Sequence, residues 1–351
     1  MNRQINYAQA ILEATEQCME ADPLVYIMGL GVTDPKGIFG TTLGLEKKFG
    51  SKRVLDMPVA ENGMTGIAIG SALVGMRPIL THQRVDFMLL SLDQIINNAA
   101  KWHYMFGGKM SVPLVIRLLV GRGWGQGPQH SQSLQALFAH IPGLKVVMPT
   151  TPYDAKGLLA AAIEDNNPVI FIEHRWLHNI IGDVPQEIYR VPLGKAQKLR
   201  TGKDLSIVSL SYMTIEALHV LDVLEKQRVS CDLIDLRSVK PIDWKSIVKS
   251  VRKTGRLLVL DTSAGFCSVA SEIIAYISMN CFSDLKQAPK KLTLPDCPTP
   301  TSTGLTKAFY AQARDIANLI GKMLGKNLGV DFEKQRKFPH DVPGDWFKGP
   351  F

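Results

Sequence analysis

One carboxylate interrupts an otherwise apolar stretch of small residues at 53–80, RVLDMPVAENGMTGIAIGSALVGMRPIL. Glu61 lies where an expected short strand gives way to an expected helix, for which Asn62 or Thr65 is the predicted N-cap. A carboxylate that is buried without a partner is costly. From this stretch alone two interpretations are open: an exposed loop acid favoured by the helix N-terminus, or an acid retained for proton chemistry.

A histidine ends a second notable loop, GRGWGQGPQH at 121–130. Its glycines allow the backbone to lie close against a ligand or another chain, while Trp124 adds an aromatic face and His130 a titratable ring. A lone histidine can equally cap a helix or lie on the surface. Ligands of parallel α/β sheets bind beyond the carboxyl ends of the strands. The loops of Glu61 and His130 and the turn at 84–87 are therefore the candidate positions.

These loops belong to a regular alternation of apolar strands and helices, which is typical of a parallel sheet covered on both faces. We predict an α/β fold in four parts: domain 1–175, a linker 176–203, a second α/β domain 204–327 and an extended, aromatic tail 328–351. The expected strands are 24–32, 54–59, 78–83, 112–120, 144–149, 167–174, 205–211, 230–236 and 256–261. After the opening helix, the expected helices are 40–50, 62–74, 86–108, 151–165, 213–226, 243–253, 268–279 and 307–326.

The composition is that of an ordinary globular protein, with 46% hydrophobic and 21% charged residues. No apolar run approaches the roughly 20 residues that span a bilayer. The N-terminus predicts an amphipathic helix capped by Asn6 rather than a signal or transit peptide. The five cysteines form no CxxC pair, which fits a reducing compartment. We expect a cytoplasmic protein that enters no membrane.

The net charge of +8 comes largely from basic runs in the second half, such as KSIVKSVRKTGR. No nucleic-acid motif accompanies these runs, so a solvated basic face is the simplest interpretation. Docking to an acidic protein surface is the alternative. The segment GLGVTD lacks the third glycine of a dinucleotide fingerprint, and Walker A, HExxH and GxSxG motifs are absent. Residue chemistry alone therefore leads to a two-domain α/β protein with a carboxylate and a histidine at strand ends.

Four segments indicate a particular protein family: 58–79, 92–108, 128–174 and 231–261. Together they resemble the β subunit of the thiamine-diphosphate-dependent decarboxylating component of 2-oxoacid (pyruvate-type) dehydrogenases, and the resemblance runs in order from about residue 3 to 325. It implies a transketolase-like pyrimidine-binding domain followed by a transketolase C-terminal domain.

The resemblance also implies roles for three side chains. The glutamate at the position of Glu61 hydrogen-bonds the aminopyrimidine ring nitrogen of thiamine diphosphate, and sharing a proton with that nitrogen helps to activate the thiazolium carbon. Phe87 matches the aromatic that packs on the pyrimidine ring. His130, in PQHSQ, matches the active-site histidine, a proton donor or substrate orienter.

The segment AAIEDNNP resembles the family's monovalent-cation loop, where mostly backbone oxygens hold a structural potassium ion. A plain helix C-terminus ending in an Asn-Asn turn is the alternative. By position, the ligands implied are Leu114, Ala162, Ile163, Asp165 and Asn167.

The chain lacks the Gly-Asp-Gly…Asn-Asn motif through which such enzymes hold the diphosphate and its Mg²⁺. The resemblance therefore implies half an active site, completed by an alpha subunit that holds Mg²⁺ in an α2β2 heterotetramer. The chain departs from the family pattern at Arg84, Asp86, Arg122 and Trp124, in the segment 261–272 and in its long tail. The last two changes fall where a lipoyl acyltransferase core would dock, so that docking stays open.

Three functions remain to be compared. The first is a 2-oxoacid dehydrogenase β subunit that feeds a lipoyl acyltransferase. The second is a two-subunit transketolase-like or acyloin-forming thiamine enzyme that passes its activated aldehyde to another acceptor. The third is a non-catalytic homologue, against which the presence of Glu61, Phe87 and His130 argues.

Overall fold

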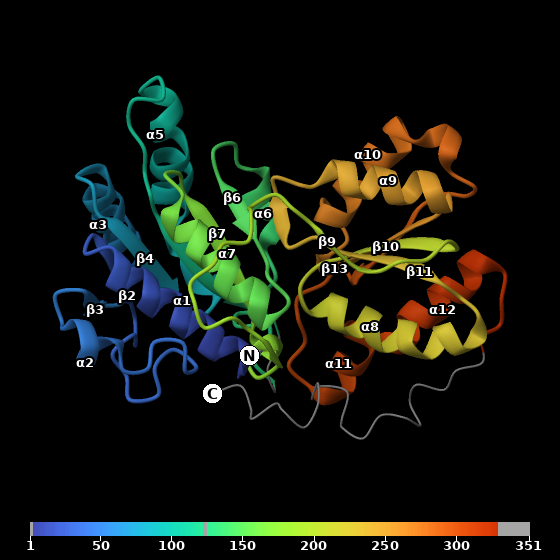
Figure 1. Ribbon diagram of the computed structural model, residues 1–351, viewed down its shortest axis with the longest axis horizontal. Coiled ribbons are helices and arrows are strands. Elements are labelled where there is room, and N and C mark those ends of the chain that lie inside the picture. Colours follow the sequence, from blue (N-terminus) through green and yellow to red (C-terminus); the bar gives the residue numbers. More distant parts are fainter. Residues whose placement is uncertain (1–2, 122–124, 329–351) are drawn as a thin grey trace.

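The computed structural model describes residues 3–121 and 125–328 and contains two α/β units side by side (Figure 1). The expected tail, apart from residue 328, lies outside the described residues, as do Arg122 and Trp124. Within the described residues, no helix has the length and hydropathy needed to cross a membrane.

The first unit is built on a seven-stranded sheet in the order β12-β6-β7-β5-β4-β2-β3. Every neighbouring pair is parallel except β12 with β6. β5 and β7 are buried along their whole length, which explains why they read as continuous apolar runs. The strands are β2 (Val25–Gly29), β3 (Val54–Asp56), β4 (Arg77–His82), β5 (Val115–Val120), β6 (Lys145–Val147), β7 (Val169–His174) and β12 (Ser238–Lys240).

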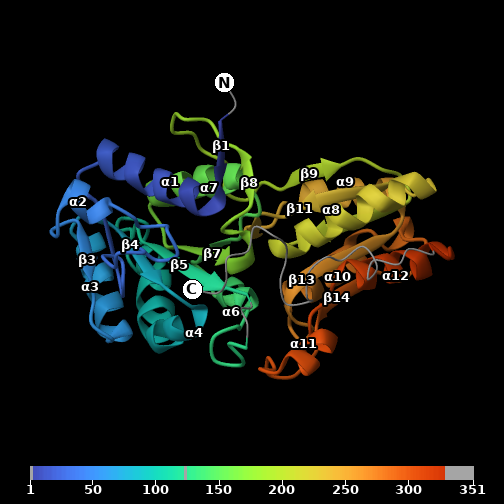
Figure 2. The same cartoon turned by 90° about the horizontal axis from the view of Figure 1, so that it is seen from below.

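Helices cover both faces of this sheet, as the sequence predicted (Figure 2). α1 (Tyr7–Ala21) and α7 (Pro152–Glu164) pack together on one face, and α3 (Glu61–Leu73), α4 (Val85–Met88) and α5 (Ala100–Met105) lie on the other. Asn6 caps α1 through a reciprocal capping box with Gln9, as expected. Two short helices, α2 (Leu45–Phe49) and α6 (Gln135–His140), complete the unit.

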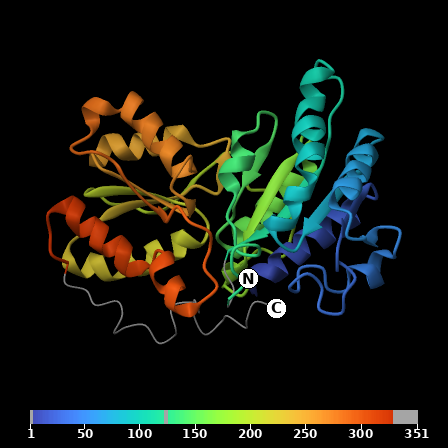
Figure 3. The same ribbon diagram turned by 180° about the vertical axis from the view of Figure 1, so that it is seen from behind.

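The second unit holds a five-stranded sheet in the order β14-β13-β10-β11-β9. Its strands are β9 (Gln197–Arg200), β10 (Leu205–Ser209), β11 (Cys231–Asp235), β13 (Leu257–Ala264) and β14 (Lys290–Leu294). α8 (Tyr212–Leu224) packs against α12 (Ala313–Leu324), and α9 (Trp244–Thr254) and α10 (Val269–Asn280) cover the opposite face (Figure 3).

The two units share a core. β12 follows β11 of the second sheet but pairs antiparallel with β6 of the first sheet, so that Ile234, Leu236 and Val239 pack in the same cluster as Val146 and Met148. Burying these side chains between the units contributes to holding the two sheets in a fixed relation.

Several short strands were not expected. β1 (Gln4–Asn6) pairs with β8 (Ile181–Asp183), and β9 lies on the edge of the second sheet, so the segment expected as a linker contains two strands. Exposed and partly buried residues alternate along β9, so no apolar run marks it in the sequence. The domain boundaries at 175 and 204 stay a prediction.

Three helix predictions were wrong in detail. The helix after β3 begins at Glu61 with Ala60 as its N-cap, not at Asn62 or Thr65. The helix expected at 86–108 divides into α4, a 3-10 turn, a π-helical turn (Gln94–Ala99) and α5. The helix expected at 307–326 divides into α11 (Thr303–Phe309) and α12, because Gln312 forms a new capping box with Asp315.

Candidate functional site

Glu61 is a buried acid whose carboxylate has no hydrogen-bond donor among the described residues. Residues 57–60 separate Glu61 from the end of β3, where the Asp56 carboxylate accepts hydrogen bonds from the N–H groups of Gly31 (2.8 Å) and Met57 (3.0 Å). The Glu61 residue is only 7% exposed and stands in the first turn of α3, where the helix dipole favours a negative charge. Such a side chain is built to receive a donor from outside the described chain.

Phe87 and His130 come together from two different loops. Phe87 lies on α4 after β4, and His130 lies on the loop after β5; their ring centroids are 5.4 Å apart with an interplanar angle of 85°. Phe87 is partly buried and His130 is exposed. The parallel strands β3, β4 and β5 have their carboxyl ends on the same side of the sheet, which is called the carboxyl edge here. Glu61, which comes after β3, therefore lies on that side as well. No hydrogen bond or ring contact joins Glu61 to the other two within the part of the chain that the structure describes.

The turn that carries Phe87 also holds the loop that carries His130. Arg84 donates hydrogen bonds to the Gly121 carbonyl oxygen (3.4 Å) and to Gln126 Oε1 (2.5 Å). Gln132 Nε2 donates to the Asp86 carboxylate at 2.6 Å. Sequence analysis marked Arg84 and Asp86 only as departures from the family pattern, and the structure shows the contacts that they make.

Exposed apolar side chains lie along α3 and near the end of α5. Along α3, Ile67 is 58% exposed and Val74, directly after the helix, is 82% exposed, while Gly63 and Gly70 on the same face have no heavy atom within 4 Å of an added Cβ. α5 projects from the body of the molecule (Figure 1), and Tyr104 near its end is 89% exposed. Apolar surface of this kind marks a protein-interaction site.

Four of the five residues expected to hold potassium have carbonyl oxygens that already accept hydrogen bonds. The carbonyl oxygens of Ile163 (3.0 Å) and Asp165 (3.3 Å) accept hydrogen bonds from one guanidinium nitrogen of Arg77. The carbonyl oxygens of Leu114 and Ala162 accept backbone N–H groups. The Asn167 N–H donates to the Asp165 carboxylate at 2.9 Å. Among the described residues, no group of three or more His, Cys, Asp or Glu side chains could hold a metal ion.

Two other buried charges in the first unit, those of Arg117 and Lys156, are paired with carboxylates. Arg117 on β5 binds Glu173 on β7 through two hydrogen bonds of 2.7 and 3.1 Å. Burial raises the pKa of Glu173, but the charge of Arg117 and the contact with His178 outweigh it and hold the pKa at about 2. Burial lowers the pKa of His178 to about 4, so this ring is neutral at neutral pH. Arg117 in the middle of an apolar strand was a signal for this network that sequence analysis missed.

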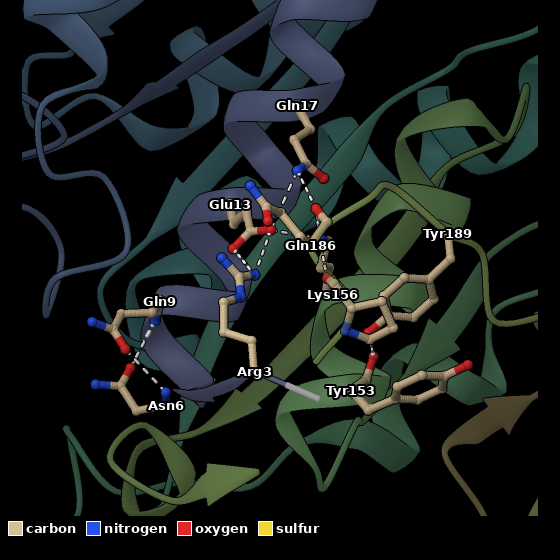
Figure 4. Close-up of polar contacts among 10 residues, drawn as sticks. Arg3, Asn6, Gln9, Glu13, Gln17, Tyr153, Lys156, Gln186 and Tyr189 are labelled. Atoms are coloured by element: carbon tan, nitrogen blue, oxygen red, sulfur yellow. Dashed lines mark hydrogen bonds and ion pairs between the residues drawn. The ribbon is translucent and has the colours of Figure 1, made fainter. Parts of the chain in front are cut away.

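Lys156 on α7 is a second buried, paired charge that sequence analysis missed (Figure 4). Its ammonium group is buried and donates to Glu13 (2.6 Å) and to the carbonyl oxygens of Pro185 (2.8 Å) and Gln186 (2.9 Å). Arg3 binds the same Glu13 carboxylate. This network ties α7 to α1 and to the segment after β8, and it has a structural role.

Comparison with known proteins agrees with this fold. A family model described as the transketolase pyrimidine binding domain matches residues 3–179, and one described as the transketolase C-terminal domain matches residues 194–316. The structure is also similar to a solved chain described as a split gene transketolase, inactive beta4 tetramer. The TM-score is 0.73 at 22% identity, covering 92% of this chain and 98% of that one, and this likeness supports the fold.

Curated relatives are similar over almost their whole length. The β subunit of acetoin:2,6-dichlorophenolindophenol oxidoreductase from Cupriavidus necator is 43% identical, covering 92% of this chain and 98% of the relative. The β subunit of 2-oxoisovalerate dehydrogenase from Bacillus subtilis is 41% identical (87% and 94%), and that of the pyruvate dehydrogenase E1 component from Porphyra purpurea is 40% identical (92% and 97%). The chain therefore belongs to the transketolase-like family of thiamine-diphosphate-dependent enzymes, in the group of E1 β subunits of 2-oxoacid dehydrogenases and their acetoin-oxidoreductase relatives.

Proposed function

We propose that this chain supplies the β half of the active site of a pyruvate-type 2-oxoacid dehydrogenase, which decarboxylates a 2-oxoacid and passes the acyl group to a lipoyl acyltransferase. The observation that carries the proposal is the buried Glu61 carboxylate, without a donor among the described residues, on the sheet edge that also holds the Phe87–His130 pair. Thiamine diphosphate, when bound, supplies the electron sink that decarboxylation requires.

Each of the three side chains has a task that suits its surroundings. Glu61 is placed to share a proton with the pyrimidine ring nitrogen, because a carboxylate shielded from water interacts strongly with a single donor. Phe87, partly buried, offers an aromatic surface to the pyrimidine ring. His130, exposed beside Phe87, can donate a proton to the substrate or orient it.

The partner is an alpha subunit, which holds Mg²⁺ and the diphosphate in an α2β2 heterotetramer. The missing Gly-Asp-Gly…Asn-Asn motif supports this assignment, and so do the exposed apolar residues along α3, the helix that begins at Glu61. The free cysteines Cys18, Cys231 and Cys281 are buried as thiols, which supports a reducing, cytoplasmic location.

Binding measurements on the chain alone test the half-site. Isothermal calorimetry with thiamine diphosphate and Mg²⁺ should show no tight binding to the isolated chain, and binding should appear after its alpha subunit is added. Sub-micromolar binding by the lone chain would contradict the proposal.

Acetoin oxidation is a second candidate function, favoured by the identity of 43% and 39% with two subunits named for acetoin. An acyloin is cleaved rather than decarboxylated, so the two activities separate in one assay. Reduction of 2,6-dichlorophenolindophenol by the reconstituted complex should be compared with pyruvate, 2-oxoisovalerate and acetoin as the sole substrate. Faster reduction with acetoin than with either acid would favour the second function.

A structural potassium ion is also proposed, held by carbonyl oxygens of Leu114, Ala162, Ile163, Asp165 and Asn167. The support is the convergence of two of these oxygens on one point, where Arg77 now donates to both. Carbonyl oxygens suit K⁺. A bound ion shares these oxygens with Arg77 or displaces its guanidinium.

A further inference from the structure

An apolar groove lies where β8 of the first unit faces α8 and β9 of the second (Figure 2). Its larger part has a volume of about 570 Å³ and its smaller part about 280 Å³, and Ile180, Ile181 and Ile215 line both parts. Leu199 and Leu218 extend the apolar lining of the larger part. Ile181 is 65% exposed, so the groove leaves apolar side chains open to water. An apolar hollow of this kind marks an interaction site.

The helix α8 contributes a stripe to this groove that the fold does not need. Four of the lining residues follow one another at helical spacing and share one face: Ile215, Leu218, His219 and Asp222. The buried side chains of α8, such as Ala217, Val220 and Leu224, belong to the opposite face, which packs into the core of the second unit. The apolar residues of the stripe are therefore available to another segment.

The described chain ends beside this same helix. The Leu328 carbonyl oxygen accepts a hydrogen bond of 2.6 Å from the side chain of Gln227, which comes just after α8. Leu328 also packs in the same apolar cluster as Leu224. At 1.5 Å per residue, α8 carries the stripe from Gln227 back to Leu218 over about 14 Å and to Ile215 over about 18 Å. The tail residues 329–351, which lie outside the described residues, thus begin at one end of the helix that lines the groove.

The sequence of the tail matches the groove in length. Phe332 is four residues beyond Leu328 and Phe338 is ten residues beyond it. Extended chain advances about 3.3 Å per residue, which gives reaches of about 13 Å and about 33 Å. Phe332 can therefore arrive at Leu218, and about 20 Å of chain remains for Phe338 to cross from the larger part of the groove to the smaller part.

The charges of the tail also match the groove. Asp222 lines the larger part and is paired with Arg200 at 3.0 Å, whereas none of the described residues forms an ion pair with Asp183, which lines the smaller part. The basic residues of the tail lie between its first two aromatic residues, at Lys334, Arg336 and Lys337. A tail that places its aromatic rings in the groove brings these cations to the side of Asp183.

We propose that residues 329–351 dock into this groove of their own chain, with Phe332 against α8 and Phe338 against β8. A tethered segment has a high effective concentration at a site beside its attachment point, which favours it over a free partner or a second copy. Because the two walls of the groove come from different units, the docked tail clamps the first unit to the second. The docking requires neither thiamine diphosphate nor an alpha subunit.

Limited digestion of the full chain with trypsin tests the proposal, because Lys334, Arg336 and Lys337 are cleavage sites inside the tail. Cleavage follows the fraction of molecules in which the tail is released. Ile181→Asp, at an exposed position of the groove, and Phe332→Ser, in the tail, should each speed cleavage of the tail by about tenfold or more. Mass spectrometry of the released fragments measures the rate.

Leu305→Asp is the matched control. Leu305 lies on α11, is also 65% exposed and is not one of the residues that line the groove, so its substitution should leave tail cleavage at the wild-type rate. Melting curves verify that the variants fold. If Ile181→Asp does not fold, Phe332→Ser decides the question, because it changes no described residue.

Three results would overturn the proposal. The first is tail cleavage at the same rate in wild type and Phe332→Ser. The second is protection of the tail that is lost when the chain is diluted, which would identify a second copy as the occupant. The third is protection that appears only after the alpha subunit is added, which would assign the tail to that partner. Protection that is independent of chain concentration and is removed by both variants supports docking within the chain, whatever the complex catalyses.

Discussion

Glu61 and Asp232 are both buried carboxylates beside a parallel sheet, but their surroundings differ. Asp232 on β11 accepts hydrogen bonds from Lys253 (2.6 Å), Ser250 (2.6 Å) and Lys198 (3.0 Å). Burial raises the pKa of Asp232, but these donors outweigh it and hold the pKa at about 2. The Glu61 carboxylate has no such donor among the described residues. Asp232 in the second unit is thus satisfied within the chain, whereas Glu61 in the first unit is left open where the strand ends.

The same contrast holds inside the first unit. Glu173 is surrounded by Arg117 and His178 in the middle of the sheet, whereas Glu61 lies at the carboxyl edge. A charge satisfied within the chain contributes to stability, and removing its partner leaves an uncompensated buried group. A charge left open adds little to the stability of the chain alone and is available to a ligand. Substituting a charge that is satisfied within the chain should therefore lower stability, whereas substituting an open charge should lower activity.

The largest effect is expected for Glu61→Gln in the reconstituted complex. Glutamine keeps the size and one hydrogen-bonding oxygen but cannot exchange a proton with the pyrimidine nitrogen. Loss of such acid–base help typically lowers a rate by about 10²- to 10⁴-fold. Single-turnover decarboxylation measures the rate, and sedimentation verifies that the complex still assembles.

Glu216→Gln is the matched control, because Glu216 is also 7% exposed but is bound by Tyr212 (2.7 Å) and the Ala313 N–H (2.9 Å). It should lower the melting temperature and leave the rate unchanged. Near wild-type turnover of Glu61→Gln would return Glu61 to the class of ordinary first-turn helix acids.

Glu173→Gln should have the largest effect on stability. It leaves Arg117 buried without its counter-charge, and breaking a buried pair in this way costs about 3 to 5 kcal/mol. Denaturant unfolding of the full chain measures the loss. The double variant Arg117→Met with Glu173→Leu should recover much of it, because an apolar pair leaves no unpaired charge; no recovery would mean that the network does more than pair charges.

Part of this contrast between satisfied and open charges could be predicted from the sequence, and part could not. Continuous apolar strands such as 115–120 predicted the parallel sheet, and the family resemblance implied roles for Glu61, Phe87 and His130 that stay predictions. Strand β12 could not be predicted, because its short segment is polar at both ends and its partner β6 is far away in sequence. Partners of buried charges are likewise set by tertiary contacts: Arg117 and Glu173 are 56 residues apart, and Arg77 meets a loop 86 residues away.

Asp232→Asn should give a smaller, pH-dependent effect. Because the folded pKa of Asp232, about 2, lies below the ordinary aspartate value of 3.8, its contribution is present above pH 4 and is lost as the pH falls toward 2. Its lysine partners are 36% and 40% exposed, so solvent screens the pairs, and we expect about 1 to 2 kcal/mol at pH 7. Unfolding of both proteins from pH 7 to pH 2 measures the difference, which should shrink toward pH 2. A difference independent of pH would show that the charge of Asp232 is not what stabilises the second unit.

The smallest effect is expected at the loop predicted to hold potassium. This loop shares features of both classes, because its carbonyl oxygens have partners within the chain and can still bind a ligand. The carbonyl oxygens of Ile163 and Asp165 are satisfied, but by Arg77, a cation that K⁺ can join or displace. An ion at a few times its Kd stabilises a protein by about 1 kcal/mol. The melting temperature in KCl should therefore exceed that in choline chloride of equal ionic strength by about 2 to 4 °C or less. Arg77→Met removes the resident cation and should make the melting temperature depend more steeply on K⁺. If the melting temperature of each protein is the same in the two salts, the loop is a helix C-terminus held by Arg77. Its carbonyl oxygens are then satisfied within the chain and bind no ion.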